Sequence, residues 1–153
     1  MGDRVRVEAI DPGQGRAVVA EVEPRHSFLT RPSVANVSLV AVVLAVEQPS
    51  FDPDQASRFL LTAERTGLEV ILLLTKTDLL SAAALERLVT RLQGWGYDPL
   101  ALSSAAGTGI DALRQRLAGA QLSVLCGPSG VGKSSLLNQF CLLYTSPSPR
   151  DCT

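Results

Sequence analysis

The stretch GPSGVGKS, residues 127–134, lies between an apolar segment, LSVLC, and a segment with helical periodicity. Its spacing fits the pattern G-x-x-x-x-G-K-S/T, in which glycines let the backbone turn with its N–H groups facing inward. A helix that begins near Lys133 would point the positive end of its dipole at the same place. The stretch therefore predicts a strand–loop–helix unit of an α/β fold, with a loop that binds the phosphates of a nucleotide.

The residue types in this loop suit phosphate binding. Lys133 is the expected catalytic residue, because its point charge reaches the outer phosphates, and the Ser134 hydroxyl is the expected magnesium ligand. Pro128 has no N–H to offer the phosphates. The alternative interpretation is a glycine-rich turn before an amphipathic helix. The predicted nucleotide-binding residues of this segment are Gly127, Pro128, Ser129, Gly130, Val131, Gly132, Lys133, Ser134 and Ser135.

Upstream of the loop, apolar segments alternate with amphipathic ones. The run VSLVAVVLAV, residues 37–46, is continuously apolar and rich in valine, which is typical of a central strand buried on both faces. Three further strands are expected at residues 70–74, 99–102 and 122–126, and helices at residues 53–66, 82–95 and 110–118, with Ser81 and either Asp52 or Asp54 as N-caps. This alternation predicts an α/β fold with a parallel sheet covered on both sides.

The two ends of the chain depart from this alternation. Residues 4–22 alternate charged and apolar side chains around a glycine turn, which predicts a hairpin of two half-buried antiparallel strands, too small to be stable alone. The pattern changes after Pro32, where we expect a domain boundary.

Residues 141–153, CLLYTSPSPRDCT, abandon helical periodicity and match the translation of a transposase adapter used in DNA sequencing. We therefore exclude this tail from the fold and expect the natural reading frame to stop near Phe140.

A second motif follows the strand expected at residues 70–74. Thr75, Lys76, Thr77 and Asp78 form the sequence T-K-x-D. The Asp78 carboxylate can accept two hydrogen bonds from the imino and amino groups of guanine, a donor pair that adenine lacks. Lys76 would lay its aliphatic stem along the base. A lysine and an aspartate after a strand are usually just solvated, but the carboxyl end of a parallel strand is where open α/β sheets bind ligands.

A third segment follows the next short strand. Ser103, Ser104 and Ala105 precede the stretch GTGIDAL and are similar to a serine–alanine loop that supports guanine through backbone N–H groups. Ordinary loop and cap chemistry produces the same composition, so this segment alone is a weak signal.

The order of these motifs is unusual, because the base motifs precede the phosphate loop, whereas most guanine-nucleotide-binding domains have the loop first. Termini of compact domains often lie close together, so joining them and cutting elsewhere preserves the sheet. The order predicts a circular permutation. With the stretches GDRV, RHSFLTRPSVANV, DQASRFLLTAERTGLEV, TKTDLL and GPSGVGKSSLLN, the chain resembles the circularly permuted ribosome-associated GTPases known as RsgA or YjeQ. The resemblance covers almost everything from Gly2 to Phe140.

This resemblance implies a domain organisation and a set of ligands. It implies the C-terminal remnant of an OB-fold barrel at residues 1–32 and the N-terminal part of a permuted P-loop GTPase domain at residues 33–140. The non-native tail expected from the sequence pattern occupies residues 141–153. The implied ligands are GTP or GDP with Mg²⁺, the implied reaction is GTP hydrolysis, and the implied partner is the small ribosomal subunit with its rRNA.

The chain also departs from the family pattern. Thr75 stands where the family usually has asparagine, which we expect to weaken one base contact and the bracing between the motifs. The family's switch segment, its magnesium-binding D-x-P-G motif and its zinc module lie beyond the phosphate loop. We therefore expect no zinc site in this chain and almost no hydrolysis by the chain alone.

Composition bears on nucleic-acid binding, membrane insertion and cysteine chemistry. The chain has 153 residues, of which 46% are hydrophobic and 19% charged, as in ordinary globular proteins, and its net charge of -1 gives no overall basic surface for nucleic acid. The longest apolar run is too short to span a bilayer, and the three cysteines follow neither a disulfide nor a zinc pattern. We expect a cytoplasmic monomer with no membrane contact. Two other hypotheses stay open: an rRNA-binding adaptor regulated by nucleotide, and an ATP-using P-loop enzyme with a coincidental T-K-T-D.

Overall fold

The computed structural model describes residues 1–30 and 33–143, with side chains as far as Phe140. Its centre is a four-stranded sheet whose neighbouring strands are all parallel, in the order β7-β6-β5-β8. The strands are β5 (Leu39–Ala45), β6 (Glu69–Thr75), β7 (Leu100–Ala101) and β8 (Ser123–Cys126). The predicted parallel α/β sheet is thus confirmed, with strand ends within two residues of the expected positions.

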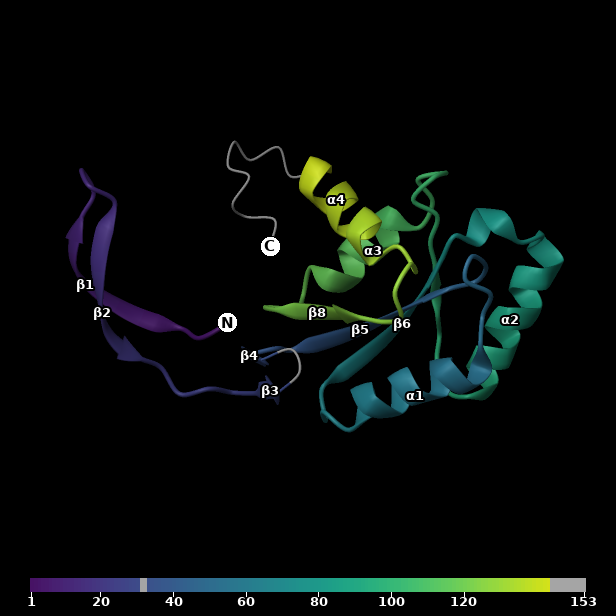
Figure 1. Ribbon diagram of the computed structural model, residues 1–153, viewed down its shortest axis with the longest axis horizontal. Helices are drawn as coiled ribbons and strands as arrows, with labels where there is room; N and C mark the ends of the chain where they lie inside the picture. The colour runs from purple at the N-terminus through teal and green to yellow at the C-terminus, as the bar shows by residue number, and fades with distance from the viewer. Residues whose placement is uncertain (31–32, 144–153) are drawn as a thin grey trace.

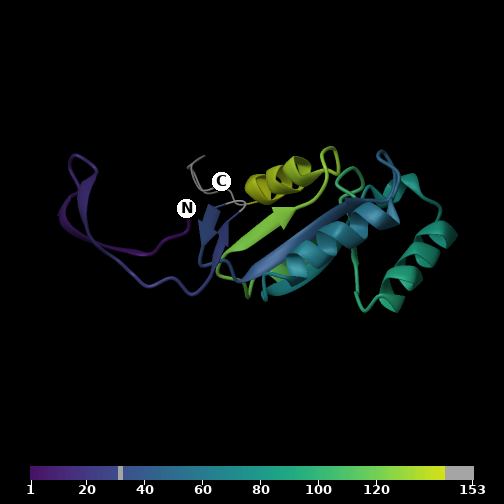
Figure 2. The ribbon, with the colours of Figure 1, turned by 60° about the horizontal axis from the view of Figure 1, so that its bottom comes forward.

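Helices cover both faces of this sheet, so the domain has three layers (Figure 1, Figure 2). The first two helices pack on one face and the last two on the other. The helices are α1 (Pro53–Glu64), α2 (Ala82–Gly94), α3 (Ile110–Leu117) and α4 (Lys133–Leu143), with a short 3-10 helix at Thr77–Leu79. The structure also confirms two helix starts that the sequence predicted. Asp52 accepts hydrogen bonds from the backbone of Asp54 and Gln55, and Ser81 accepts one from Ala84.

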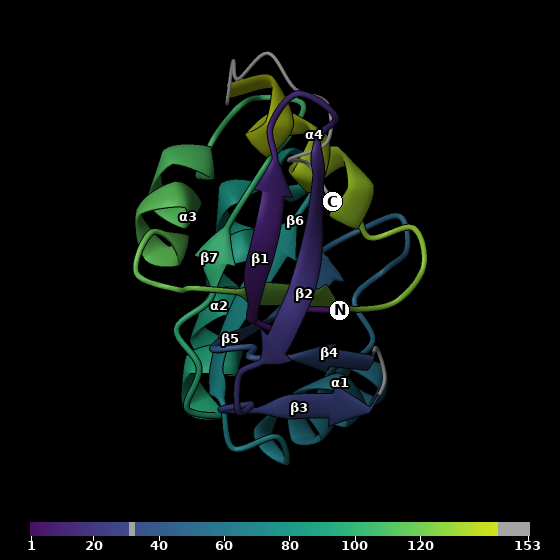
Figure 3. The ribbon, with the colours of Figure 1, turned by 90° about the vertical axis from the view of Figure 1, so that its left-hand side faces the viewer.

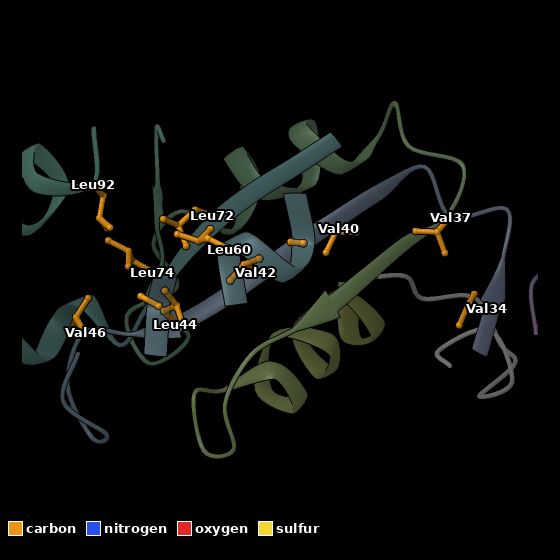
Figure 4. Close-up of a cluster of buried hydrophobic side chains, with 12 residues drawn as sticks. Val34, Val37, Val40, Val42, Leu44, Val46, Leu60, Leu72, Leu74 and Leu92 are labelled. Carbon is orange, nitrogen blue, oxygen red and sulfur yellow. The ribbon is translucent and has the colours of Figure 1, made fainter. Parts of the chain in front are cut away.

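The central strand β5 is buried along its whole length and contributes side chains to the packing against both helical layers. Its even-numbered side chains, such as Val42, pack toward α1 and α2, and its odd-numbered side chains, such as Val43, pack toward α3 and α4. Figure 4 shows Val42 and Leu44 beside Leu60 of α1. Burial of each such side chain contributes roughly 1.5–3 kcal/mol. A strand apolar on both faces is stable only between two helical layers, which explains the valine-rich run.

The N-terminal hairpin differs from its prediction in one respect. Strands β1 (Val5–Asp11) and β2 (Arg16–Val22) pair in antiparallel fashion, as expected, but every residue in both strands is exposed. The expected half-burial is therefore wrong. The physical reason is visible in Figure 1 and Figure 2, where the hairpin stands apart from the helical layers, so its alternating apolar side chains pack against none of these helices. Figure 3 views the molecule from the hairpin side, with β1 and β2 side by side in front.

A second hairpin was not predicted from the sequence. Strands β3 (Phe28–Thr30) and β4 (Ser33–Ala35) pair in antiparallel fashion next to the start of β5. Each strand has three residues, too few to show an alternating pattern. Val34 and Ala35 are buried, so this hairpin attaches the N-terminal segment to the sheet domain.

The C-terminal helix also differs from its prediction. The sequence pattern indicates a break at Cys141, but α4 continues through Leu143. The remainder of the tail, residues 144–153, lies outside the described residues. Within residues 1–30 and 33–143, no helix combines the length and apolar character needed to cross a membrane.

The two-sided packing of the sheet makes a prediction about stability. Leu73 lies in β6 with 0% of its surface exposed, so Leu73→Ala should lower the free energy of unfolding by about 2–5 kcal/mol. Leu61 of α1 is 64% exposed and gives the matched control, for which Leu61→Ala should change stability by less than about 0.5 kcal/mol. Urea denaturation measures both, and equal losses would contradict the assigned core.

Candidate nucleotide-binding site

A small pocket lined by Leu44, Pro49, Phe51, Pro128 and Val131 lies where the chain leaves the neighbouring strands β5 and β8 on opposite faces of the sheet. After β5 the chain passes to α1 on one face, and after β8 it passes to α4 on the other. In open parallel sheets, ligands bind at this kind of switch point, beyond the carboxyl ends of the strands. The phosphate loop follows β8 and the T-K-x-D segment follows β6, so the predicted motifs lie at the same end of the sheet (Figure 1).

The phosphate loop begins with a glycine in close contact with the sheet. A Cβ atom added at Gly127 would lie 2.1 Å from the carbonyl oxygen of Val43, so only glycine fits. Gly132, at the other end of the loop, has a φ of 96°, in the left-handed region that favours glycine. These two glycines let the backbone approach β5 and then turn into α4, leaving a cradle that suits a phosphate group.

The charged residue of the loop is held inside it. The Lys133 ammonium donates to the carbonyl oxygens of Gly127 at 2.7 Å and Pro128 at 2.6 Å. Ser134 and Ser135 are exposed in the first turn of α4, where the helix dipole favours anions. Burial raises the pKa of the Cys126 thiol beside the loop, and the nearby charge of Lys133 partly offsets this effect.

The T-K-x-D segment is bonded directly to the phosphate loop. Thr75 is only 4% exposed, and its hydroxyl donates to the carbonyl oxygen of Val131 at 2.5 Å, with the Leu44 carbonyl oxygen 3.3 Å away. The sequence led us to expect weaker bracing with threonine in place of asparagine. The structure shows one hydrogen bond between the two motifs at this position, from the Thr75 hydroxyl, and the expected weakening relative to asparagine stays a prediction.

Lys76 makes a second bridge between the motifs. Its backbone is left-handed, with a φ of 59°, and its ammonium donates to the Gly130 carbonyl oxygen at 2.8 Å. The same ammonium also donates to the carbonyl oxygen of Gln48, in the loop between β5 and α1. This lysine therefore connects three loops: its own loop after β6, the β5–α1 loop and the phosphate loop.

The acidic residue of the motif is oriented by the serine loop. The Ser103 hydroxyl donates to Asp78 Oδ1 at 2.5 Å and accepts from the Ala106 backbone N–H at 3.1 Å. The Ser103 backbone N–H donates to the Thr108 carbonyl oxygen at 3.0 Å, so this residue acts through its side chain. Thr77 joins the same two loops, because its hydroxyl donates to the Leu102 carbonyl oxygen at 3.0 Å.

These contacts bring all the sequence-predicted segments into one connected site. They also reveal two residues that the sequence analysis missed. Gln48 participates through its backbone carbonyl oxygen, which no sequence pattern identifies. Gln139 of α4 donates from its side-chain amide to the Ser104 carbonyl oxygen at 2.8 Å, and no pattern in the sequence marks this contact.

Comparison with known proteins identifies the family. The family model described as RsgA GTPase matches residues 22–144. The chain belongs to the RsgA GTPase family. A Synechococcus protein (strain CC9605) named small ribosomal subunit biogenesis GTPase RsgA is 97% identical over 141 residues, which are 92% of this chain and 46% of that protein. The RsgA of Synechococcus strain CC9311 is 72% identical over 138 residues, which are 90% of this chain and 45% of that protein.

Solved structures agree with this assignment. YjeQ from Thermotoga maritima superposes with a TM-score of 0.77 at 35% identity, covering 90% of this chain and 49% of that one. YloQ, described as a circularly permuted GTPase, gives a TM-score of 0.69 at 28% identity, covering 94% of this chain and 50% of that one. The chain thus has the fold of permuted RsgA GTPases and spans about half the length of the relatives it matches.

The bracing by Thr75 can be tested by removing its hydroxyl. Thr75→Val keeps the side-chain shape but leaves the buried Val131 carbonyl oxygen without this donor, so the free energy of unfolding should fall by about 1–3 kcal/mol. Thr75→Ser retains a hydroxyl and should lose less. The control is Thr90→Val on the exposed surface of α2. If thermal and urea unfolding were equal for the Thr75→Val and Thr90→Val proteins, the bracing role would be rejected.

Proposed function

We propose that the full-length protein binds GTP and hydrolyses it to GDP and phosphate during biogenesis of the small ribosomal subunit. The observation that carries the proposal is the pair of hydrogen bonds from Thr75 and Lys76 to the phosphate loop. They join a phosphate-binding element to an element with the chemistry to recognise guanine. The names of the RsgA relatives support both the GTPase activity and the small subunit as the site of action.

The phosphate side of the site supports triphosphate binding. Backbone N–H groups of residues 129–132 and the N-terminus of α4 attract the phosphate oxygens, and Lys133 stabilises charge on the outer phosphates. The exposed Ser134 hydroxyl is the residue in this segment that would hold Mg²⁺. When bound, Mg²⁺ neutralises charge on the β- and γ-phosphates.

The base side of the site supports guanine over adenine. In our proposal, Asp78 accepts two hydrogen bonds from the imino and amino groups of guanine, and Ser103 holds its carboxylate in place for that contact. Ser104 and Ala105 present backbone N–H groups to the guanine oxygen, as the family resemblance implies. Adenine offers no such donor pair to Asp78, so an adenine base would displace water from this carboxylate without replacing its hydrogen bonds, which makes adenine binding unfavourable.

The setting of this activity is part of the same proposal. We place the protein in the cytoplasm as a monomer that docks on the small subunit and its rRNA, without a membrane. In this proposal Mg²⁺ accompanies the nucleotide. Within the described residues, no group of three or more His, Cys, Asp and Glu side chains gathers to bind a metal ion.

Nucleotide selectivity tests the assignment of Asp78. The full-length gene product should bind GDP more tightly than ADP. Asp78→Asn should weaken GDP binding by at least about tenfold, because asparagine keeps only one oxygen that can accept from the two donor groups of guanine. Asp98→Asn, at another exposed aspartate, is the control. Isothermal titration measures these affinities. A preference for ADP would favour the ATP-using enzyme, and unchanged selectivity would remove Asp78 from base recognition.

Turnover tests the catalytic part of the proposal. GTP hydrolysis by the full-length gene product should rise when small ribosomal subunits are added, and Lys133→Ala should reduce turnover at saturating GTP by at least about 100-fold. Arg87→Ala, on the exposed surface of α2, should retain turnover. Phosphate release measured with and without subunits gives both results. Absence of stimulation would favour the alternative, an rRNA-binding adaptor that nucleotide regulates without significant hydrolysis.

A further inference from the structure

Gln139 connects the phosphate-loop helix to the loop that follows β7. It lies on α4, six residues after Lys133, and is half-buried. Its Nε2 donates to the carbonyl oxygen of Ser104 at 2.8 Å. Its Oε1 is buried and has no hydrogen-bond partner among the residues that the structure describes. The side-chain amide therefore makes one polar contact, directed at the base side of the site.

The loop held by Gln139 is closed by its own hydrogen bonds. Ser103 and Thr108 exchange two backbone hydrogen bonds, of 3.0 and 3.1 Å, so residues 104–107 form a short turn between them. Ser103, at the start of this turn, donates to the carboxylate of Asp78. Gln139 thus holds Ser104, which is the neighbour of Ser103, and Ser103 orients Asp78.

The chemistry of the amide argues against a purely space-filling role. A buried oxygen without a donor destabilises the folded chain, and an apolar side chain of the same size avoids that cost. A glutamine at this position therefore contributes something that an apolar residue cannot. That contribution is the N–H donated to the carbonyl oxygen of Ser104, since the reverse amide orientation would place two oxygens against each other.

We propose that Gln139 is a positioning residue for guanine recognition, which holds the 103–108 turn against Asp78 from the phosphate-loop helix. This proposal rests on the proposed function, because it concerns the same base site. It gives α4 two tasks: its first turn faces the phosphates, and a later turn fixes the loop that faces the base. Occupancy of the phosphate side and order on the base side are then mechanically linked through one helix.

The test separates hydrogen bonding from packing in the full-length gene product. Gln139→Met has a similar unbranched shape but no donor and no buried orphan oxygen, so the protein should melt at the same temperature or higher. Its affinity for GDP should fall about five- to tenfold, with a loss of selectivity for GDP over ADP. The inhibition constant of inorganic pyrophosphate as a competitor of nucleotide should not change, because pyrophosphate contacts the phosphate loop alone.

Two further variants complete the test. Gln139→Glu cannot donate as a carboxylate and places a charge against the Ser104 carbonyl oxygen, so its loss of GDP selectivity should equal or exceed that of Gln139→Met. Asn138→Leu changes the adjacent exposed amide of α4 and should leave GDP and ADP affinities unchanged.

The outcomes distinguish this inference from the function on which it rests. If the unmodified protein selects GDP over ADP and Gln139→Met keeps that selectivity, the positioning role is rejected and the proposed function stands. Equal weakening of GDP, ADP and pyrophosphate binding, with a lower melting temperature, would indicate a general packing role and also reject it. If the unmodified protein does not select GDP, both proposals fail together.

Discussion

The buried hydroxyl of Thr75, hydrogen-bonded to the carbonyl oxygen of Val131, connects the carboxyl end of β6 to the phosphate loop. The sheet determines where Thr75 lies, because β6 pairs with β5 along all seven of its residues. The loop in turn begins against β5, where Gly127 contacts the Val43 carbonyl oxygen. Two motifs separated by about fifty residues of chain therefore take their positions from the same central strand, and the contacts of Lys76 and Ser103 depend on that alignment.

This arrangement explains why the permuted order of the motifs does not disturb the site. The geometry depends on strand order in the sheet and on which ends of the strands lie together, and neither depends on which strand comes first in the chain. What the permutation changes is the connection between elements. Here the chain forms β5 first, then adds β6 and β7 on one side of β5, and only then crosses to form β8 on the other side. The base-recognition loops therefore precede the phosphate loop in the sequence.

Much of this structure could be predicted from the sequence, and the side-chain contacts that were missed share one physical character. The strands and helices of the sheet domain follow from residue periodicity, and the phosphate loop from the spacing of Gly127, Gly132 and Lys133. The missed contacts, at Gln48 and at the Ser104 carbonyl oxygen bound by Gln139, use backbone carbonyl oxygens. Every residue has such an oxygen, so no residue type marks where one is used. The predicted half-burial of the N-terminal hairpin was also wrong, because alternating charged and apolar residues predict an apolar face but not the surface that covers it.

Gly127 shows how strongly one contact constrains the gene. Its Cβ position is already taken by the Val43 carbonyl oxygen, and the clash is with backbone rather than with a flexible side chain. Every amino acid reachable from a glycine codon by a single nucleotide change has a Cβ atom. Any missense change in the Gly127 codon therefore forces the backbone of the loop or of β5 to shift, whatever the chemistry of the incoming residue, and only synonymous changes leave this contact as it is.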